Sequence, residues 1–264
     1  MKLSELMSLQ GKKALVAGGA GLLGSEISDV LAELGADVII ASRDIEKCRV
    51  KAEKLTSDYP GNKYYSYLID IADPDSIRDC ISSIECDLGG FDILVTCAWS
   101  GRKNDWDSIN DADWNYDIEV CLNGVFRLIK SATPTLKKNK GLVLTIGSMY
   151  GHVAPDYRLY EGVPQSNPPS YGAAKAGIIQ LTKYIASFLA QDGIRANCIS
   201  PGPFPFEEVL DQHPVFKERL CNKNPMGRVG KSYEIKGAVA LLCSDASSYM
   251  TGQNICVDGG WSIW

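Results

Sequence analysis

The sequence predicts an α/β fold in which a parallel sheet is covered by helices on both faces. Strand-like and helix-like patterns alternate from one end of the 264-residue chain to the other. The strand-like segments are short, continuous apolar runs, which are typical of parallel strands buried on both sides. A glycine-rich turn lies between the first strand and the first helix, as in dinucleotide-binding βαβ units. Together these observations predict a single doubly wound Rossmann domain, residues 1–264, with a sheet of about seven strands.

Each element follows from a local pattern. The strands are apolar and often β-branched, and we expect them at 13–17, 37–41, 63–69, 91–97, 141–146, 195–200 and 254–257. The helices show apolar residues at helical spacing, and we expect them at 22–34, 44–57, 74–87 and 111–133, after Pro169, and in segments up to residue 244. Gly35 and Pro74 mark a helix end and a helix start, positions at which glycine and proline are common.

Composition indicates a soluble cytoplasmic protein without a metal site. The formal net charge is −5 and charges of both signs are interspersed, which argues against nucleic-acid and membrane partners. No apolar run approaches the roughly 20 residues of a membrane span, and the first residues lack a signal-peptide core. Nine cysteines are scattered without a CxxC pair, beside only two histidines. This distribution predicts reduced thiols, no disulfide framework and no metal.

The glycine-rich turn predicts a dinucleotide site. Residues 19–24 match G-x-G-x-x-G, and a further glycine precedes them. Glycines allow a tight turn and a close approach of the backbone to a pyrophosphate, and the following helix N-terminus favours negative charge. The alternative is an ordinary glycine-rich turn, but the position in the first βα unit favours the dinucleotide. The residues expected to contact the cofactor here are Gly18, Gly19, Gly21, Leu22, Leu23 and Gly24.

The end of the second strand favours NADP(H) over NAD(H). Ser42 is neutral, and the guanidinium of Arg43 can pair with a 2′-phosphate. Asp44 leaves NAD(H) as an alternative cofactor, because an acidic residue in this region binds the ribose hydroxyls of NAD. Asp70 ends the third strand and can meet the adenine, or alternatively cap the helix that begins at Pro74.

Tyr171 and Lys175 are the candidate catalytic pair. Their spacing of four residues places a phenol and an ammonium on one face of a helix. Reduction of a ketone needs a proton donor, and a nearby ammonium stabilises the phenolate that the donor leaves behind.

At this point the chain resembles the short-chain dehydrogenase/reductase family over nearly its whole length. The matching segments are the glycine loop, Asp70-Ile71, Ser148, Tyr171 with Lys175, 200–202, and 251–260. The resemblance implies an oxidoreductase that transfers a hydride between NADP(H) and a carbonyl or secondary alcohol. It implies that Ser148 orients the carbonyl, that Tyr171 is the acid/base, and that Lys175 holds the nicotinamide ribose. It also implies cofactor contacts at Ile71, Cys97, Ala98, Trp99, Pro201 and Gly202.

The sequence departs from the family pattern at several points. Glycines 18, 21 and 24 are spaced as in the family's extended members. Trp99 stands where the family has a glycine, beside the expected nicotinamide site. Cys121 aligns with the helix asparagine of the family's proton relay, and Asn123 lies two positions further, on a nearly opposite helix face.

The segment 152–170 is longer than is usual in the family and rich in polar and aromatic residues. It is either a surface flap or part of a substrate site for a hydroxylated or charged molecule. The candidate substrate residues are Trp99, Tyr157, Tyr160 and Pro203.

Three functions remain open within this fold. The first is a dehydrogenase or reductase of a polyol, sugar or sugar derivative, similar to sugar and gluconate 5-dehydrogenases. The second is a 3-oxoacyl-thioester ketoreductase, for which Arg102-Lys103 and Lys217 with Arg219 would supply a basic entrance. The third is a cofactor-binding regulator without turnover, suggested by Trp99 and Cys121. Family resemblance also implies a homodimer or homotetramer, and the apolar C-terminus 261–264 is expected at a subunit interface or folded back on the core.

Overall fold

The computed structural model describes residues 1–102, 104–163 and 166–264, and its centre is one parallel sheet. Seven strands pair in the order β3-β2-β1-β4-β5-β6-β7, all parallel. The predicted α/β class with a doubly wound parallel sheet is therefore confirmed. The strands are β1 (Lys13–Ala17), β2 (Asp37–Ser42), β3 (Tyr64–Leu68), β4 (Ile93–Thr96), β5 (Leu142–Ile146), β6 (Arg195–Pro201) and β7 (Asn254–Val257).

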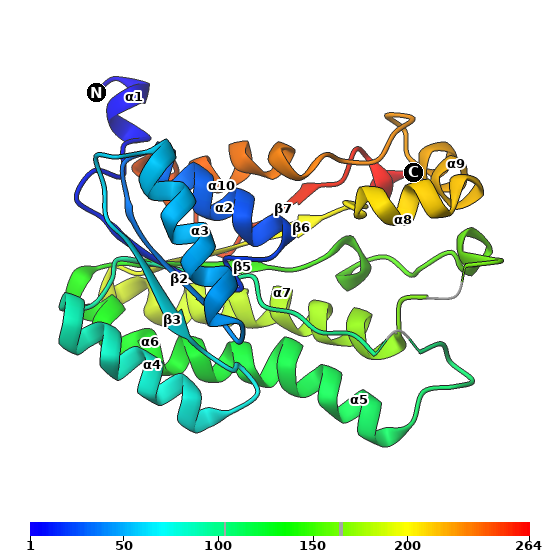
Figure 1. The fold of residues 1–264 in the computed structure, drawn as a ribbon, viewed down its shortest axis with the longest axis horizontal. Coiled ribbons are helices and arrows are strands. Elements are labelled where there is room, and N and C mark those ends of the chain that lie inside the picture. Colours follow the sequence, from blue (N-terminus) through cyan, green and yellow to red (C-terminus); the bar gives the residue numbers. More distant parts are fainter. Residues whose placement is uncertain (103, 164–165) are drawn as a thin grey trace.

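Helices cover both faces of the sheet (Figure 1). On one face lie α2 (Leu22–Glu33), α3 (Ile45–Asp58) and α10 (Lys236–Cys243), and on the other lie α4 (Pro74–Leu88), α5 (Asp111–Ile118), α6 (Gly124–Asn139) and α7 (Pro169–Leu189). Beyond the ends of β5 and β6 lie α8 (Glu207–Gln212) and α9 (Pro214–Lys223), and the chain starts with α1 (Leu3–Leu6). The short 3₁₀ turns are η2 (Met149–Gly151), η3 (Tyr157–Tyr160), η4 (Ala190–Asp192), η5 (Ser232–Ile235), η6 (Asp245–Ser247) and η7 (Trp261–Ile263).

The strand order places a ligand crevice beside β1. The chain leaves β1 toward β2 and β3 and then returns to β4 on the other side of β1. Ala17, the last residue of β1, pairs with Ala41 on one side and with Thr96 on the other. The loops that follow β1, β2 and β4 therefore start from the same edge of the sheet. In open α/β sheets, ligands bind at such a reversal of strand order, outside the carboxyl ends of the strands.

Two apolar layers hold the helices to the sheet. The strands alternate their side chains between the layers, so that Leu15 and Ile39 contact one layer while Val16 and Ile40 contact the other. Almost every strand residue of β1, β2, β4 and β5 is buried. Burial on both faces explains why these strands read as continuous apolar runs.

The predicted helix 111–133 differs from the structure in its interior and at its end. A π-helical turn, η1 (Glu119–Asn123), joins α5 to α6, and the helical path continues to Asn139. The periodicity of apolar residues predicts one continuous helix here and does not reveal a single wide turn. Such π turns occur often at functional sites.

The carboxylate that caps the start of α4 belongs to Asp73 and not to Asp70. Asp73 is the N-cap of the helix, and its side chain accepts the N–H of Asp75 at 2.9 Å. The proposed capping role of Asp70 is therefore wrong. Asp70 instead accepts the N–H of Ala72 at 3.0 Å, within the turn that follows β3.

Among the residues that the structure describes, no helix combines the length and the apolar character that crossing a membrane requires.

Close packing of α6 against the turn after β3 gives a test of the fold. A Cβ on Gly124 would collide with the carbonyl oxygen of Ile71, whereas a Cβ on Gly237 in α10 would meet no atom within 4 Å. We expect Gly124→Ala to lower the free energy of unfolding by about 1–3 kcal/mol, the usual effect of overpacking. Gly237→Ala should raise it by up to about 1 kcal/mol, because alanine loses less backbone entropy in a helix. Denaturant unfolding of both variants measures the difference, and equal effects would contradict the packing described here.

Candidate active site

The glycine loop, the end of β2 and the end of β4 enclose a cavity of about 340 Å³. Its walls include eight of the residues expected to hold the cofactor, namely Gly18, Gly21, Ser42, Arg43, Ile71, Cys97, Ala98 and Trp99. Lys47 and Asp44, from the start of α3, also line it. Gly19, Leu22, Leu23 and Gly24 lie in or directly after the same loop, but they are not among the lining residues.

The glycines of the loop leave room that side chains would fill. Gly18 has φ +85°, and a Cβ there would lie 2.7 Å from the backbone nitrogen of Ala98. A Cβ on Gly24 would collide with the carbonyl oxygen of Gly18. Gly21 is the N-cap of α2 and supplies no side chain to cap it. The first N–H groups of the helix are thus left for an anion at this cradle, and the residues fit a dinucleotide pyrophosphate.

At the end of β2, Asp44 is engaged as a helix cap. Its carboxylate accepts the N–H of Lys47 at 3.1 Å and lies 3.4 Å from the Lys47 ammonium. The hydrogen bond from the Lys47 backbone lowers the pKa of Asp44. Arg43 is exposed and donates to the hydroxyl of Tyr116, on α5, at 3.1 Å.

The three candidate catalytic residues converge at the end of β5. Ser148 follows β5 by two positions, and its Oγ accepts the N–H of Tyr150 at 3.1 Å. Lys175 is buried on α7, and its Nζ donates to the carbonyl oxygen of Ile146 at 2.8 Å. The same Nζ lies 5.6 Å from the centre of the Tyr171 ring. Tyr171 is half-buried one helical turn before Lys175.

A second cavity, of about 420 Å³, opens beside this cluster. Ser148 and Tyr171 line it, together with Tyr160, Gly202 and Pro203. Of the other candidate substrate residues, Trp99 is on its wall, whereas Tyr157 is not among the lining residues. Pro201 is buried at the end of β6, directly before Gly202.

Trp99 separates the two cavities because it lines both. Its indole meets the Tyr171 ring edge-on, with ring centres 5.9 Å apart and planes at 74°. About half of its side chain is exposed. The residue that replaces the family glycine thus touches the candidate acid/base and forms part of both walls.

The described parts of the long segment, residues 152–163 and 166–170, lie over the second cavity and pack on α8 and α9. Leu159, Tyr160 and Val163 join Phe216 and Leu220 in an apolar cluster. Arg219 of α9 donates to the carbonyl oxygen of Glu161 at 2.6 Å. The C-terminal Trp261 is buried in the same cluster, whereas Ile263 and Trp264 are exposed. The fold-back alternative therefore holds for Trp261, and a subunit interface at the C-terminus stays a prediction.

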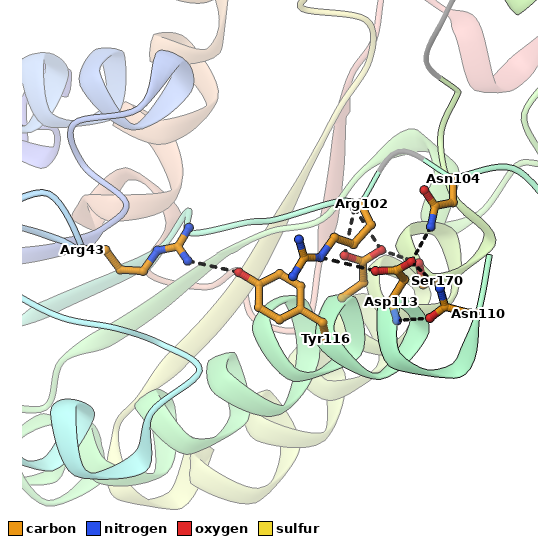
Figure 2. A network of polar contacts seen from close by, with 8 residues as sticks. Arg43, Arg102, Asn104, Asn110, Asp113, Tyr116 and Ser170 are labelled. Carbon is orange, nitrogen blue, oxygen red and sulfur yellow. Dashed lines mark hydrogen bonds and ion pairs between the residues drawn. The ribbon is translucent and has the colours of Figure 1, made fainter. Parts of the chain in front are cut away.

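A polar network connects the end of β2 to the start of α7 (Figure 2). The Tyr116 hydroxyl accepts from Arg43, and the Arg102 guanidinium stacks on the Tyr116 ring at 4.2 Å. The hydrogen bond from Arg43 lowers the pKa of Tyr116. Arg102 also pairs with Asp113 at 3.6 Å, and Asn104 and Asn110 donate to that carboxylate.

A buried carboxylate continues this network to the residue beside Tyr171. Asp117 is fully buried and accepts the N–H of Arg102 at 3.1 Å and the hydroxyl of Ser170 at 2.6 Å. Ser170 directly precedes Tyr171. Asp117 therefore links the loop after β4 to the helix turn that carries the candidate acid/base.

Cys121 lies in the π turn η1 and is buried. Its thiol donates to the carbonyl oxygen of Ser100 at 3.0 Å, and burial raises its pKa. Asn123 does not replace it, because its amide donates to Glu119 at 2.8 Å.

Several residues of this site were not among those predicted from the sequence. Tyr150 and Asn167 line the second cavity, and Asp117 and Ser170 support α7. Tyr150 carries a usable signal, since a residue two positions after Ser148 must lie near it. Asp117 carries no such signal, because an acidic residue in a helix usually faces solvent.

The Asp117–Ser170 bond gives a test of the supporting network. Ser170→Ala leaves a buried carboxylate oxygen without its hydroxyl donor, so we expect the free energy of unfolding to fall by about 1–3 kcal/mol. The matched control is Ser108→Ala, which removes an equally short bond, 2.6 Å to Asp105, from an exposed turn. That variant should unfold almost as the parent does. Urea unfolding compares the two, and similar losses would contradict a special role for the buried bond.

Comparisons with known proteins agree with this geometry. Residues 18–262 match the family model described as enoyl-(acyl carrier protein) reductase. The 3-oxoacyl-[acyl-carrier-protein] reductase of Salmonella typhimurium is 34% identical over 255 residues, which cover 96% of this chain and 98% of that protein. Sorbose reductase of Candida albicans is 35% identical over 264 residues, 98% of this chain and 89% of that one.

Solved structures show the same fold. A gluconate 5-dehydrogenase of Burkholderia cenocepacia, in complex with NADP and tartrate, superposes with a TM-score of 0.89 at 28% identity, covering all of both chains. A short-chain type dehydrogenase/reductase of Mycobacterium marinum gives a TM-score of 0.88 at 30% identity, covering 99% of each chain. The chain therefore belongs to the short-chain dehydrogenase/reductase family, the nicotinamide-dependent oxidoreductases of carbonyl and alcohol groups.

Proposed function

We propose that this protein is an NADP(H)-dependent reductase or dehydrogenase of a polar, sugar-like or polyol substrate, with Tyr171 as its acid/base. Residues 1–264 would form one domain that both binds the dinucleotide and carries the catalytic residues. The observation that carries the proposal is the convergence of Ser148, Tyr171 and Lys175 on one cavity, beside the glycine-lined crevice, with Trp99 shared between the two.

The residues have distinct roles in this mechanism. The bound nicotinamide supplies or accepts the hydride. Ser148 Oγ accepts from the Tyr150 backbone, so its own hydrogen is left to polarise a substrate carbonyl. The Tyr171 hydroxyl gives its proton to the substrate oxygen in reduction and takes it back in oxidation. Lys175, fixed on Ile146, places a positive charge beside the Tyr171 ring and stabilises the phenolate.

The preference for NADP(H) rests on the end of β2. Arg43 and Lys47 place two cations on the wall of the glycine-lined cavity. The one acidic side chain beside them, Asp44, is already engaged as the cap of α3. A 2′-phosphate would therefore meet positive charge there. The NADP in the Burkholderia cenocepacia structure also supports this choice.

The choice of substrate rests on the second cavity. Its wall includes Tyr150, Tyr160 and Asn167 beside the catalytic pair, which suits an oxygen-rich substrate. The sorbose reductase and gluconate 5-dehydrogenase relatives are named for such substrates.

A second candidate is reduction of a 3-oxoacyl thioester, favoured by the relatives named for that activity. Phe204, Phe206 and Phe216 give part of the cavity an apolar wall. Two of the cations expected at a basic entrance are engaged in other contacts in the structure. Arg219 binds the carbonyl of Glu161 and Arg102 stacks on Tyr116, whereas Lys103 lies outside the described residues.

The assembly we propose is a homodimer or homotetramer. Phe126 of α6 and the stacked pair Tyr184 and Phe188 of α7 are exposed apolar groups on two long helices of the same sheet face, as an interface requires. We further propose a cytoplasmic location, supported by nine cysteines that are all unpaired.

Removal of the phenol tests the acid/base role. We expect Tyr171→Phe to lower kcat for carbonyl reduction by about 10²–10⁴-fold, the usual contribution of a positioned proton donor. The dissociation constant of NADPH should stay within about twofold, because the ring itself remains. Steady-state kinetics and fluorescence titration give the two values. The control Tyr233→Phe alters an exposed ring on η5 and should leave both unchanged; normal turnover in Tyr171→Phe would overturn the role.

Removal of the guanidinium tests cofactor choice. We expect Arg43→Ala to raise the KM for NADPH about 10–100-fold, since a hydrogen bond to a charged group contributes about 1.5–3 kcal/mol. The KM for NADH should change little, because NADH lacks the phosphate. Arg49→Ala is the control, as Arg49 lies nearby on α3 and pairs with Glu46. An equal change for both cofactors would show that Arg43 makes no phosphate contact.

A further inference from the structure

Two phenols form a pair in the wall of the substrate cavity. The hydroxyls of Tyr150 and Tyr160 lie 3.0 Å apart, and both side chains line the cavity that holds Ser148 and Tyr171. Asn167, also on the wall, donates its amide N–H to the Tyr160 hydroxyl at 2.8 Å. The proposed mechanism uses none of these side chains.

One of the two phenol O–H groups in this pair has no acceptor in the described part of the structure. Each phenol has a single O–H hydrogen, and each oxygen can also accept. The Tyr160 oxygen already accepts from Asn167, and one phenol hydrogen joins the two oxygens. The other phenol hydrogen has no acceptor among the bonds of the described residues. Whichever phenol donates within the pair, one O–H remains for a molecule in the cavity.

Both groups are held as neutral donors in fixed positions. Burial raises the pKa of Tyr150 and of Tyr160, so the phenols keep their hydrogens at neutral pH. The Tyr160 ring packs on Phe216 with centres 5.4 Å apart. Tyr150 is buried and belongs to the same apolar cluster as Trp261. Little side-chain entropy is therefore lost when a ligand binds to them.

The chain connects this pair directly to the reaction centre. Tyr150 lies two residues after Ser148 and donates its backbone N–H to Ser148 Oγ. Its side chain also lines the same cavity as that of Tyr171. A substrate whose carbonyl lies between Ser148 and Tyr171 would therefore extend toward the phenol pair.

We propose that Tyr150 and Tyr160 are specificity residues that bind a second oxygen of the substrate, a hydroxyl remote from the reacting carbonyl. The inference rests on the proposed function and deepens it, because it selects a hydroxylated ketone or polyol over a plain ketone. Besides the indole of Trp99, the other polar side chains that the structure describes on the wall are hydroxyls, amides and an imidazole, namely Ser148, Ser166, Asn167, Tyr171, Gln212 and His213. They suit neutral substrate oxygens.

The test compares one hydroxylated ketone with one that lacks hydroxyls. The probes are D-fructose and 2-hexanone, reduced with NADPH by the full-length protein and by Tyr150→Phe/Tyr160→Phe. We expect the double variant to lose about 10–100-fold in kcat/KM for D-fructose, because the site no longer pairs the substrate hydroxyl. The value for 2-hexanone should stay within about twofold. The control Tyr249→Phe alters a fully exposed tyrosine and should change neither value.

The single variants identify the phenol that contacts substrate. Loss in only one of them identifies the donor, and loss in both shows that the pair acts together. Thermal melting checks folding. If the double variant does not fold, the single variants decide, and at least one must lose about fivefold or more for D-fructose relative to 2-hexanone. Unchanged selectivity in every folded variant would overturn the proposal.

A binding measurement separates this proposal from the proposed function. D-sorbitol is titrated into the protein with bound NADP⁺, and the change in tryptophan fluorescence reports binding, since Trp99 lies on the cavity wall. If the parent reduces no ketone yet binds sorbitol about 10-fold more tightly than the double variant, the phenol pair keeps its role and the redox assignment fails. If the parent neither reduces D-fructose nor binds sorbitol, the substrate class proposed here is wrong.

Discussion

The bond from the Lys175 ammonium to the carbonyl oxygen of Ile146 fixes the geometry on which the site depends. Ile146 is the last residue of β5, and Ser148 follows it by two positions. Tyr171 lies one helical turn before Lys175. This 2.8 Å contact joins α7 to the end of β5, in addition to the apolar packing of α7 on the sheet, and a serine and a tyrosine from distant parts of the chain line one cavity there. The ammonium is buried, so this charge-assisted bond also compensates part of its desolvation.

The reversal of strand order at β1 supplies the other half of the site. The sheet order forces the loops after β1, β2 and β4 to share one edge, which encloses the glycine-lined cavity. Trp99, from the loop after β4, closes this cavity on the side of Tyr171. A large aromatic ring thus replaces the empty space that a glycine would leave. The sheet order and the loop backbone thus form the glycine-lined cavity, whereas the side chains of the loops shape the cavity at Tyr171.

The fold and the convergence of the candidate catalytic residues were predictable from sequence because they depend on local signals. Burial on both faces makes each central strand a continuous apolar run, and a glycine is required at position 18 because a Cβ there would lie 2.7 Å from the backbone of the loop after β4. Asp70 shows where local signals fail, since Asp73 was an equally good cap by type and lies next to Pro74. The Asp117–Ser170 bond joins residues 53 positions apart, and no local sequence pattern predicts such a pair. The phenol pair depends on how η3 packs on α9, which propensity alone does not determine.

Cys121, in place of the family asparagine, changes the contacts that this helix turn makes. An asparagine at this position would offer an amide for a water-mediated proton relay, by resemblance to the family. The thiol is a weak donor, and its hydrogen is used on the carbonyl oxygen of Ser100. Ser100 directly follows Trp99, and its backbone nitrogen lies 3.5 Å from the Cys121 sulfur. The buried cysteine therefore holds the loop that carries Trp99 against the π turn. The same loop also binds Asp117 through the N–H of Arg102. Two buried side chains, one from α5 and one from η1, thus hold the loop whose Trp99 lines both the glycine-lined cavity and the cavity at Tyr171.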